Sequence, residues 1–286
     1  MLILKDKPGQ LCNRLWAFSP FISDALENNY KVKILHFYDY YEYFENLESF
    51  NNLSFIKKSK SLSFYFYRII LVLIKLIPEF VLNAFGIYYR KNDNVAYLDI
   101  KKNIVIINSW DKKDTEKKLR IGDLQKLFQP KIKSVNKVNL IFQEKRKSSD
   151  LIIGVHIRRG DYKQYNNGKF FYSDSEYISF MSQLKKEFTE HQKITFLLCS
   201  NELVKLEAYK NISVFQIPEA NLIEDLYGLS KCDYLIGSPS TYSMWASFYG
   251  QKPLLFLKNA NLKLKLKDFG IIVSQNRFAN GTVFSN

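Results

Sequence analysis

The chain has 286 residues, enough for two domains that each bury a core. Its 42 Lys and Arg residues outnumber its 28 Asp and Glu residues, and the net charge of +14 favours anionic partners such as nucleic acid, acidic lipid or a phosphorylated substrate. The basic residues are scattered and form no zinc-finger, homeodomain or RNP signature, so no nucleic-acid partner is expected. The spacing of Cys12, Cys199 and Cys232 suits neither a zinc site nor a disulfide framework.

The first half of the chain begins with a β-α-β pattern. Apolar runs at 2–4 and 32–37 flank a helix whose apolar face covers 15–25. Pro20 is expected to kink this helix or to start it anew with Ser19 as its cap. No basic n-region precedes the first run and no cleavage site follows it, so we expect a cytoplasmic protein.

An apolar, aromatic-rich segment covers residues 61–90. Charged residues and Pro78 interrupt it before it reaches the roughly 20 apolar residues that a membrane-spanning helix needs. Two interpretations stay open. The segment forms either a helix that carries Arg68 and Lys75 and lies on the anionic inner face of a membrane, or an ordinary helical hairpin packed on the core.

A polar, Lys-rich stretch at 143–149 is expected to link two domains, 1–147 and 148–286. The second of these shows apolar runs separated by helix-length intervals, which predicts a doubly wound parallel sheet. The strands are expected at 151–157, 194–198, 214–217, 234–236 and 254–257. The clearest helix begins at Ser173, which forms a capping box with Glu176.

The stretch GVHIRRGDY, residues 154–162, carries the strongest chemical signal. It follows a buried strand, and open α/β sheets bind ligands at the carboxyl ends of their strands. A guanidinium fork at such a place can hold a diphosphate by bidentate hydrogen bonds. Arg158 and Arg159 face opposite ways if the strand continues, so one is expected to bind the ligand and the other to pair with a carboxylate, with Asp161 nearest. His156 shares the face of Arg158.

HIRRGDY resembles the HxRRxD signature of the α-1,2-fucosyltransferases, glycosyltransferase family 11, which the α-1,6- and protein O-fucosyltransferases share in looser form. GQLCNRLWAF, residues 9–18, is similar to the family's Gly-rich loop at the entry to the first helix, although Gln10 and Cys12 replace glycines and Arg14 replaces a glutamine. EDLYGLSKCDYLIGSPSTYSMWASFYG, residues 224–250, resembles the third family motif. The three motifs lie in family order.

The resemblance implies a GT-B-like α/β fold of two Rossmann-like domains. It further implies an inverting, metal-independent transferase, without a cofactor, that moves fucose from GDP-fucose to a hydroxyl of an oligosaccharide, O2 of a terminal galactose. The nucleotide-sugar donor would bind mainly to the C-terminal domain, and the glycan acceptor to the N-terminal domain.

The resemblance also implies roles for single residues. Arg158 corresponds to the arginine that binds the donor diphosphate and His156 to the histidine beside it, and both are expected to bind the donor together with Arg159. Asp225 falls where relatives recognise guanine, and the hydroxyls of Ser240 and Thr241 fall where relatives face the phosphate. The loop residues of the first motif are Gly9, Asn13 and Arg14.

Elementary chemistry supports some of these roles. Ser240 is expected to cap a helix that runs to about Gly250, and a helix N-terminus attracts an anion, although a cap without a ligand is the simpler alternative. Arg158 can stabilise the charge of a leaving GDP without a metal. The nearest approach to a DxD motif, residues 174–176, is better explained as a helix cap. Asp161 is a candidate general base or a structural partner for an arginine.

Two other functions remain open at this point. The first is a transferase of the same fold with another nucleotide sugar, because fold and phosphate binding do not fix the sugar. The second is a non-catalytic protein that binds an anionic ligand. A dehydrogenase is disfavoured, because no GxGxxG follows the first strand of either half.

Overall fold

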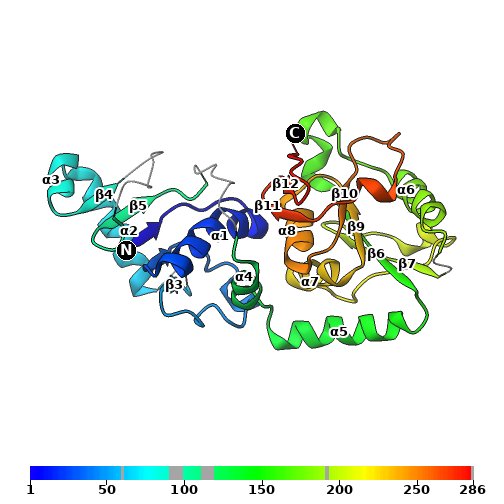
Figure 1. Cartoon of the computed structure of the whole chain (residues 1–286), viewed down its shortest axis with the longest axis horizontal. Helices are drawn as coiled ribbons and strands as arrows, with labels where there is room; N and C mark the ends of the chain where they lie inside the picture. Colours follow the sequence, from blue (N-terminus) through cyan, green and yellow to red (C-terminus); the bar gives the residue numbers. More distant parts are fainter. Residues whose placement is uncertain (59–60, 90–98, 111–118, 191–192, 285–286) are drawn as a thin grey trace. The chain divides into compact units, whose positions relative to one another are not determined.

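A computed structural model describes residues 1–58, 61–89, 99–110, 119–190 and 193–284. The chain divides into two compact units, Met1–Lys131 and Ile132–Asn286. Each unit is an α/β domain around its own five-stranded sheet of parallel strands (Figure 1). The predicted α/β fold class is confirmed.

The first unit has the strand order β3-β2-β1-β5-β4, and all of these neighbours are parallel. Its strands are short and apolar: β1 (Leu2–Leu4), β2 (Val32–Ile34), β3 (Leu53–Phe55), β4 (Ile87–Tyr89) and β5 (Ile104–Ile107). Its helices are α1 (Leu11–Asn28), α2 (Leu62–Leu76), α3 (Glu79–Ala84) and α4 (Ile121–Leu127). Helices α2 and α3 form the insertion between β3 and β4 that residues 61–90 predict; residue 90 lies outside the described residues.

Helix α1 runs through Pro20 as one helix. Ser19 therefore does not cap a second helix, and that prediction is wrong. The Ser19 hydroxyl instead donates to the carbonyl oxygen of Leu15 one turn earlier, at 2.5 Å, and its side chain is buried. A buried hydroxyl that bonds the i−4 carbonyl is satisfied inside a helix and needs no helix end.

The second unit has the strand order β10-β9-β6-β7-β8, again with parallel neighbours. Its strands are β6 (Leu151–Ile157), β7 (Ile194–Ser200), β8 (Val214–Phe215), β9 (Tyr234–Gly237) and β10 (Leu254–Phe256). Its helices are α5 (Ile132–Arg146), α6 (Asp174–Glu187), α7 (Leu222–Lys231) and α8 (Thr241–Gly250). A small antiparallel pair, β11 (Ile272–Ser274) and β12 (Arg277–Phe278), follows near the end. The predicted strands and the doubly wound parallel sheet are therefore confirmed.

The position of β6 decides where a ligand can bind. The chain builds β7 and β8 on one side of β6 and then crosses to build β9 and β10 on the other. Ligands of doubly wound sheets bind at such a reversal, at the carboxyl ends of the strands. His156 pairs with Gly237 there, and a Cβ atom on Gly237 would lie 2.8 Å from the His156 carbonyl oxygen. Only glycine therefore lets β9 approach β6 this closely.

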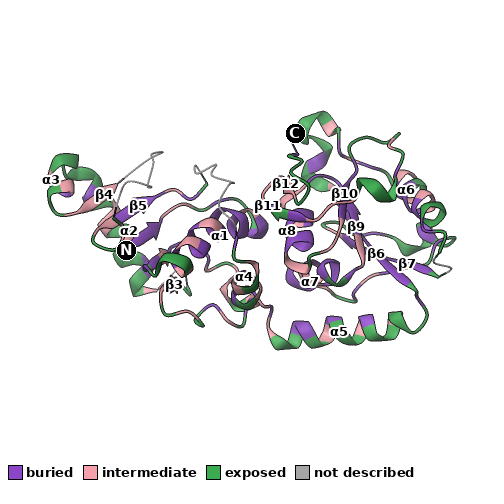
Figure 2. Ribbon diagram, in the orientation of Figure 1, coloured by how far each residue is buried: buried purple, intermediate pink, exposed green. Residues whose placement is uncertain are grey.

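Helix α5 decides where the two units divide. It runs to Arg146, whose guanidinium forms two hydrogen bonds with Asp233 of the second unit, at 2.5 and 2.8 Å. Figure 2 shows α5 as a mostly exposed helix with a buried stripe, which includes Val138 and Phe142. The polar stretch at 143–149 is thus partly helix, and the division falls after Lys131 and not after residue 147. Polar composition alone does not separate a linker from the exposed face of a helix.

The described helices give one further finding. None of those in the described ranges is both long and apolar enough to cross a membrane.

Candidate functional site in the second unit

His156 lies at the carboxyl end of β6 and contacts helix α8. Its Nδ1 atom is 2.7 Å from the Ser243 hydroxyl and 3.2 Å from the Ser240 hydroxyl, and the two hydroxyls are 3.0 Å apart. On the ring face, His156 stacks on Tyr242 with the centroids 4.8 Å apart. The histidine is therefore held by one stacking contact and by hydroxyls on a single ring nitrogen.

The charge state of His156 follows from its surroundings. The side chain is buried, and burial together with the nearby charge of Arg158 lowers its pKa to about 3. A neutral imidazole has one donor and one acceptor nitrogen. Both hydroxyls on Nδ1 can donate to it, so a tautomer with Nδ1 as the acceptor and Nε2 as the N–H donor fits these contacts.

Arg158 follows β6 directly and pairs with Asp161. The Nη2 atom of Arg158 lies 2.9 Å from the carboxylate of Asp161, and the guanidinium lies over the Tyr162 ring, 5.4 Å from its centroid. Among the described residues, the other guanidinium nitrogens have no hydrogen-bond partner, and the side chain is 19% exposed. The guanidinium thus keeps donors for an anion while a carboxylate fixes its position.

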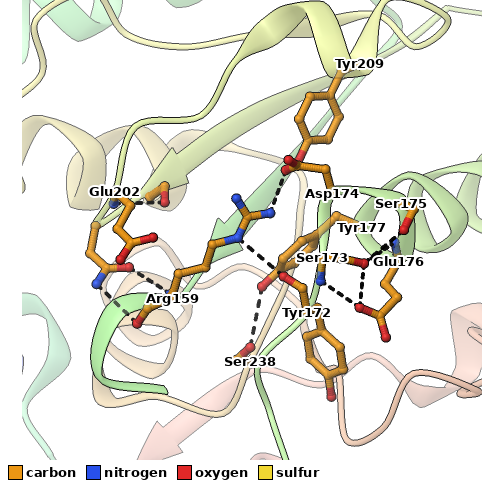
Figure 3. A network of polar contacts seen from close by, with 12 residues as sticks. Arg159, Tyr172, Ser173, Asp174, Ser175, Glu176, Tyr177, Glu202, Tyr209 and Ser238 are labelled. Carbon is orange, nitrogen blue, oxygen red and sulfur yellow. Dashed lines mark hydrogen bonds and ion pairs between the residues drawn. The ribbon is translucent and has the colours of Figure 1, made fainter. Parts of the chain in front are cut away.

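Arg159 belongs to a different network, which Figure 3 shows. Its guanidinium donates to the Asp174 carboxylate at 2.5 Å and to the Tyr172 carbonyl oxygen at 3.3 Å, and the Tyr209 hydroxyl donates to the same carboxylate. The sequence named Asp161 as the nearest partner for the arginine that does not face the ligand. In the structure Asp161 pairs with Arg158, and Arg159 pairs with Asp174 at the start of α6.

Gly160 produces this divergence. Its φ angle is +58°, a left-handed conformation that L side chains rarely adopt, and a Cβ atom would lie 2.9 Å from the Asn201 amide. The Asn201 side chain also accepts from the Arg159 amide N–H at 2.9 Å. The turn therefore comes directly after the two arginines that follow β6, and it keeps Asp161 on the side of Arg158.

Asp225 lies in the first turn of α7, half-buried next to the end of β7. The Cys199 thiol contacts the Asp225 backbone at 3.7 Å, and Cys199 is paired with His156 in the sheet. Burial raises the pKa of the Asp225 carboxyl to about 6, against a smaller lowering effect of the Cys199 thiol. The thiol donates to the Asp225 backbone carbonyl oxygen and not to the carboxylate.

Ser240 is the N-cap of α8, and its hydroxyl accepts from the Ser243 backbone N–H at 3.1 Å. The predicted cap is confirmed. Thr241 is the first residue of the helix and is half-buried. Both hydroxyl residues therefore lie at the positive end of a helix dipole, next to His156.

The loop after β9 is joined to the segment after β6. The Tyr162 hydroxyl donates to the Pro239 carbonyl oxygen at 2.5 Å, and the Ser238 hydroxyl donates to the Phe170 carbonyl oxygen at 2.7 Å. These buried bonds hold the arginine segment and the α8 N-terminus side by side. The structure thus brings His156, Arg158 and Ser240 together.

The predicted N-terminal loop residues lie in the first unit. Arg14 is buried, and its guanidinium donates to the carbonyl oxygens of Gly9 and His36 and to the Asp39 carboxylate. Gly9 has a φ of +33°, and a Cβ atom there would collide with the Asn13 amide. Arg14 therefore holds the loop to the end of β2.

The described residues contain no group of three or more His, Cys, Asp or Glu side chains that could hold a metal ion. The residues best placed for an anion are instead a guanidinium, a neutral imidazole and a helix N-terminus.

Comparison with known proteins adds an identification to this geometry. The family described as Glycosyl transferase family 11 matches residues 123–265, half of the chain. The chain belongs to glycosyl transferase family 11. The predicted family of α-1,2-fucosyltransferases is thereby confirmed, and the protein is a glycosyltransferase. No curated protein sequence matches the chain.

Solved fucosyltransferase structures share the fold. A mutant of Arabidopsis thaliana FUT1 in complex with GDP has a TM-score of 0.60 at 13% identity, covering 99% of this chain and 76% of that one. POFUT1 in complex with GDP gives 0.56 at 9% identity, with coverages of 89% and 97%. NodZ α-1,6-fucosyltransferase soaked with GDP-fucose gives 0.55 at 15% identity, with coverages of 96% and 98%. The predicted GT-B-like architecture is confirmed.

The sequence interpretation missed three residues that shape this site. Ser243 was predictable, because the third residue of a helix supplies the N–H that an N-cap hydroxyl accepts. Tyr242 and Cys199 gave no signal. Their roles depend on which strand and which helix lie against β6, and nothing local in the sequence carries that information.

Proposed function

We propose that this family 11 enzyme transfers fucose from GDP-fucose to a hydroxyl of an oligosaccharide acceptor. The observation that supports it best is Asp225. This carboxylate is half-buried and has a raised pKa, and the neighbouring Cys199 thiol donates to the Asp225 backbone carbonyl oxygen instead of to it. Guanine offers N1–H and N2–H side by side, and an ionised carboxylate accepts both. No other common base has that pair of donors.

The diphosphate then lies against the residues after β6 and β9. Arg158 binds it through the nitrogens that Asp161 leaves available. The N–H of His156 and the N-terminus of α8 supply neutral donors beside it. Because charge builds up on the diphosphate as the bond to fucose breaks, donors fixed in advance stabilise the transition state more than the ground state.

The reaction proceeds with inversion, by attack of the acceptor hydroxyl on the face of the sugar opposite the diphosphate. A general base that removes the proton from the acceptor hydroxyl accelerates such an attack. Asp161 is the candidate from the sequence, but its ion pair with Arg158 favours a positioning role. The acceptor itself, O2 of a terminal galactose, rests on family membership.

A panel of nucleotide sugars tests the donor. The enzyme is incubated with GDP-fucose, GDP-mannose, UDP-galactose and ADP-glucose, with and without lactose, and released nucleotide and fucosylated product are quantified. We expect turnover of GDP-fucose and of none of the other three donors, and we expect lactose to increase that turnover. Preference for another sugar nucleotide would identify a different transferase of this fold, and binding without turnover would identify a non-catalytic protein.

A further inference from the structure

The first unit carries an apolar surface that the donor site does not explain. Seven large apolar residues of α2 are exposed: Tyr65 and Val72, and beside them a row of five, Leu62, Phe66, Ile69, Leu73 and Leu76. Their spacing of four, three, four and three residues places them in one stripe along the helix. Phe80 of α3 and Phe85 directly after it extend the apolar surface, with exposed fractions of 75% and 79%.

Helix α2 is apolar on its opposite face as well. Phe64 and Ile74 are buried there in a cluster with Ile3 and Ile106 of the sheet. A helix with apolar residues on two opposite faces normally buries both of them. Monomeric soluble proteins rarely expose a continuous patch of this kind unless it binds something. The core satisfies one face of α2, and the other face needs a second apolar environment.

The charges around the apolar surface indicate what that environment is. Residues 49–78 contain no Asp or Glu, but they contain Lys58, Arg68 and Lys75, whereas Lys57 pairs with Glu48 just before this range. Arg68 and Lys75 are seven residues apart, about two helical turns, so they share one side of the helix, next to Tyr65 and Val72 at the edge of the exposed apolar surface. Arg68 also lies over the Phe64 ring, 5.8 Å from its centroid. Neither cation has a carboxylate partner in the described part of the chain.

We propose that α2 and α3 dock on an anionic lipid surface, with the apolar stripe among the acyl chains and the cations at the phosphates. Interfacial helices combine an apolar face of this kind with flanking Lys and Arg residues. A second copy of the chain fits less well. Pairing two such surfaces would bring the Arg68 and Lys75 side chains of both copies together, with Glu79 as the one acidic residue between positions 49 and 92.

Vesicle co-sedimentation tests the docking with the full chain. Wild type is mixed with vesicles of phosphatidylcholine and phosphatidylglycerol at three to one, and with vesicles of phosphatidylcholine alone. We expect binding to the first at least about tenfold stronger, decreasing as salt is added. Equal binding to both vesicles, or binding to neither, would overturn the proposal.

Matched variants locate the docking surface. Ile69→Gln with Leu73→Gln should weaken binding about tenfold or more, whereas Leu140→Gln with Leu203→Gln, exposed leucines of the second unit, should not. Arg68→Gln with Lys75→Gln should weaken it about tenfold, whereas Lys185→Gln with Lys186→Gln, the same change in net charge, should weaken it far less.

Three controls make these outcomes decisive. Unchanged melting temperature and unchanged GDP binding show that a variant is folded. Equal loss in a variant and its matched control would contradict a local surface. Sedimentation velocity without lipid tests whether the apolar surface pairs two copies of the chain instead. If the wild type is a dimer and the Ile69→Gln, Leu73→Gln double variant is a monomer, the surface is a dimer interface and the proposal is overturned. Because the readout is lipid binding, its failure leaves the donor assignment unaffected.

Discussion

The imidazole of His156 stacks on the phenol ring of Tyr242 while its Nδ1 atom contacts the Ser243 hydroxyl at 2.7 Å. One face and one nitrogen of the ring are thereby fixed by α8. The remaining nitrogen, Nε2, is the atom that can act on a ligand at the end of β6.

His156→Phe separates these two functions, because phenylalanine keeps the stack on Tyr242 and loses the donor. We expect kcat/KM for the donor to fall about ten- to a hundredfold, which corresponds to about 1–3 kcal/mol for a lost buried hydrogen bond. Steady-state kinetics measures the change. Tyr242→Phe is the control, since it removes only a hydroxyl that donates to the Leu222 carbonyl oxygen. Near-normal kinetics of the His156 variant would make the histidine purely structural.

Arg158→Lys keeps a positive charge and removes the planar fork. The ammonium cannot bind the diphosphate in a bidentate manner while it stays paired with Asp161, so most activity should be lost, about a hundredfold in kcat. Rapid-quench or steady-state assays at saturating donor report the loss. Turnover close to the wild-type rate would refute the assignment of Arg158.

Arg159→Lys has the same chemistry at a position with a different role. Its guanidinium bridges the Asp174 carboxylate and the Tyr172 carbonyl oxygen, and one ammonium cannot maintain both contacts in the same geometry. We expect the free energy of unfolding in urea to fall by about 1–2 kcal/mol, with kcat changed less than threefold, roughly. If this variant instead loses turnover at unchanged stability, Arg159 and not Arg158 contacts the donor.

Asp225→Asn tests the guanine contact. The amide presents an N–H to a guanine N–H, so GDP affinity measured by calorimetry should fall about tenfold or more. Burial already disfavours the charged carboxyl, which is why its pKa is about 6. The neutral variant should therefore melt at the same temperature or slightly higher without ligand at pH 7.5. Unchanged GDP affinity would show that Asp225 does not contact guanine and only occupies the first turn of α7.

The same carboxyl predicts a pH dependence of GDP binding. A pKa raised in the folded protein means that folding takes up a proton between the unfolded value, 3.8, and about 6. The contribution of Asp225 to stability is thus present below the lower value and lost as pH rises through 6. Guanine needs the ionised form, so GDP affinity should weaken below pH 6. Any pH dependence that Asp225→Asn shares belongs to the GDP phosphate.

Transfer is expected to survive excess EDTA. Arg158 and the α8 N-terminus supply the positive potential that a bridging cation supplies in other nucleotide-sugar enzymes. The assay compares initial rates with 10-fold excess chelator and with added Mn²⁺ or Mg²⁺, roughly at millimolar concentration. Loss of activity on chelation with rescue by either ion would contradict this prediction.

The sequence by itself determined the features that depend on residues close together in the chain. The apolar runs at 151–157 and 234–236 are strands of a sheet that is covered on both faces. Side chains on both faces of such a strand are buried, so nearly every residue in it is apolar. The Ser173 capping box and the Ser240 cap follow from side chains within one helical turn. The position of Arg158 at a strand end, and the family motif around it, were therefore available from the sequence.

Only the tertiary structure decided which of these residues meet. The chain crosses from β8 to β9 on the far side of β6, and this crossing brings His156 to Ser240 and Ser243, more than 80 positions later. Because of the left-handed turn at Gly160, Asp161 pairs with Arg158, and Arg159 pairs with Asp174. The exposure of the apolar stripe of α2 was also known only from the tertiary structure. Periodicity identifies an apolar face, but it does not tell whether another part of the chain covers that face. Contacts between distant residues depend on crossovers and turns whose free energies are set by the whole packed domain, and no local pattern of residues encodes them.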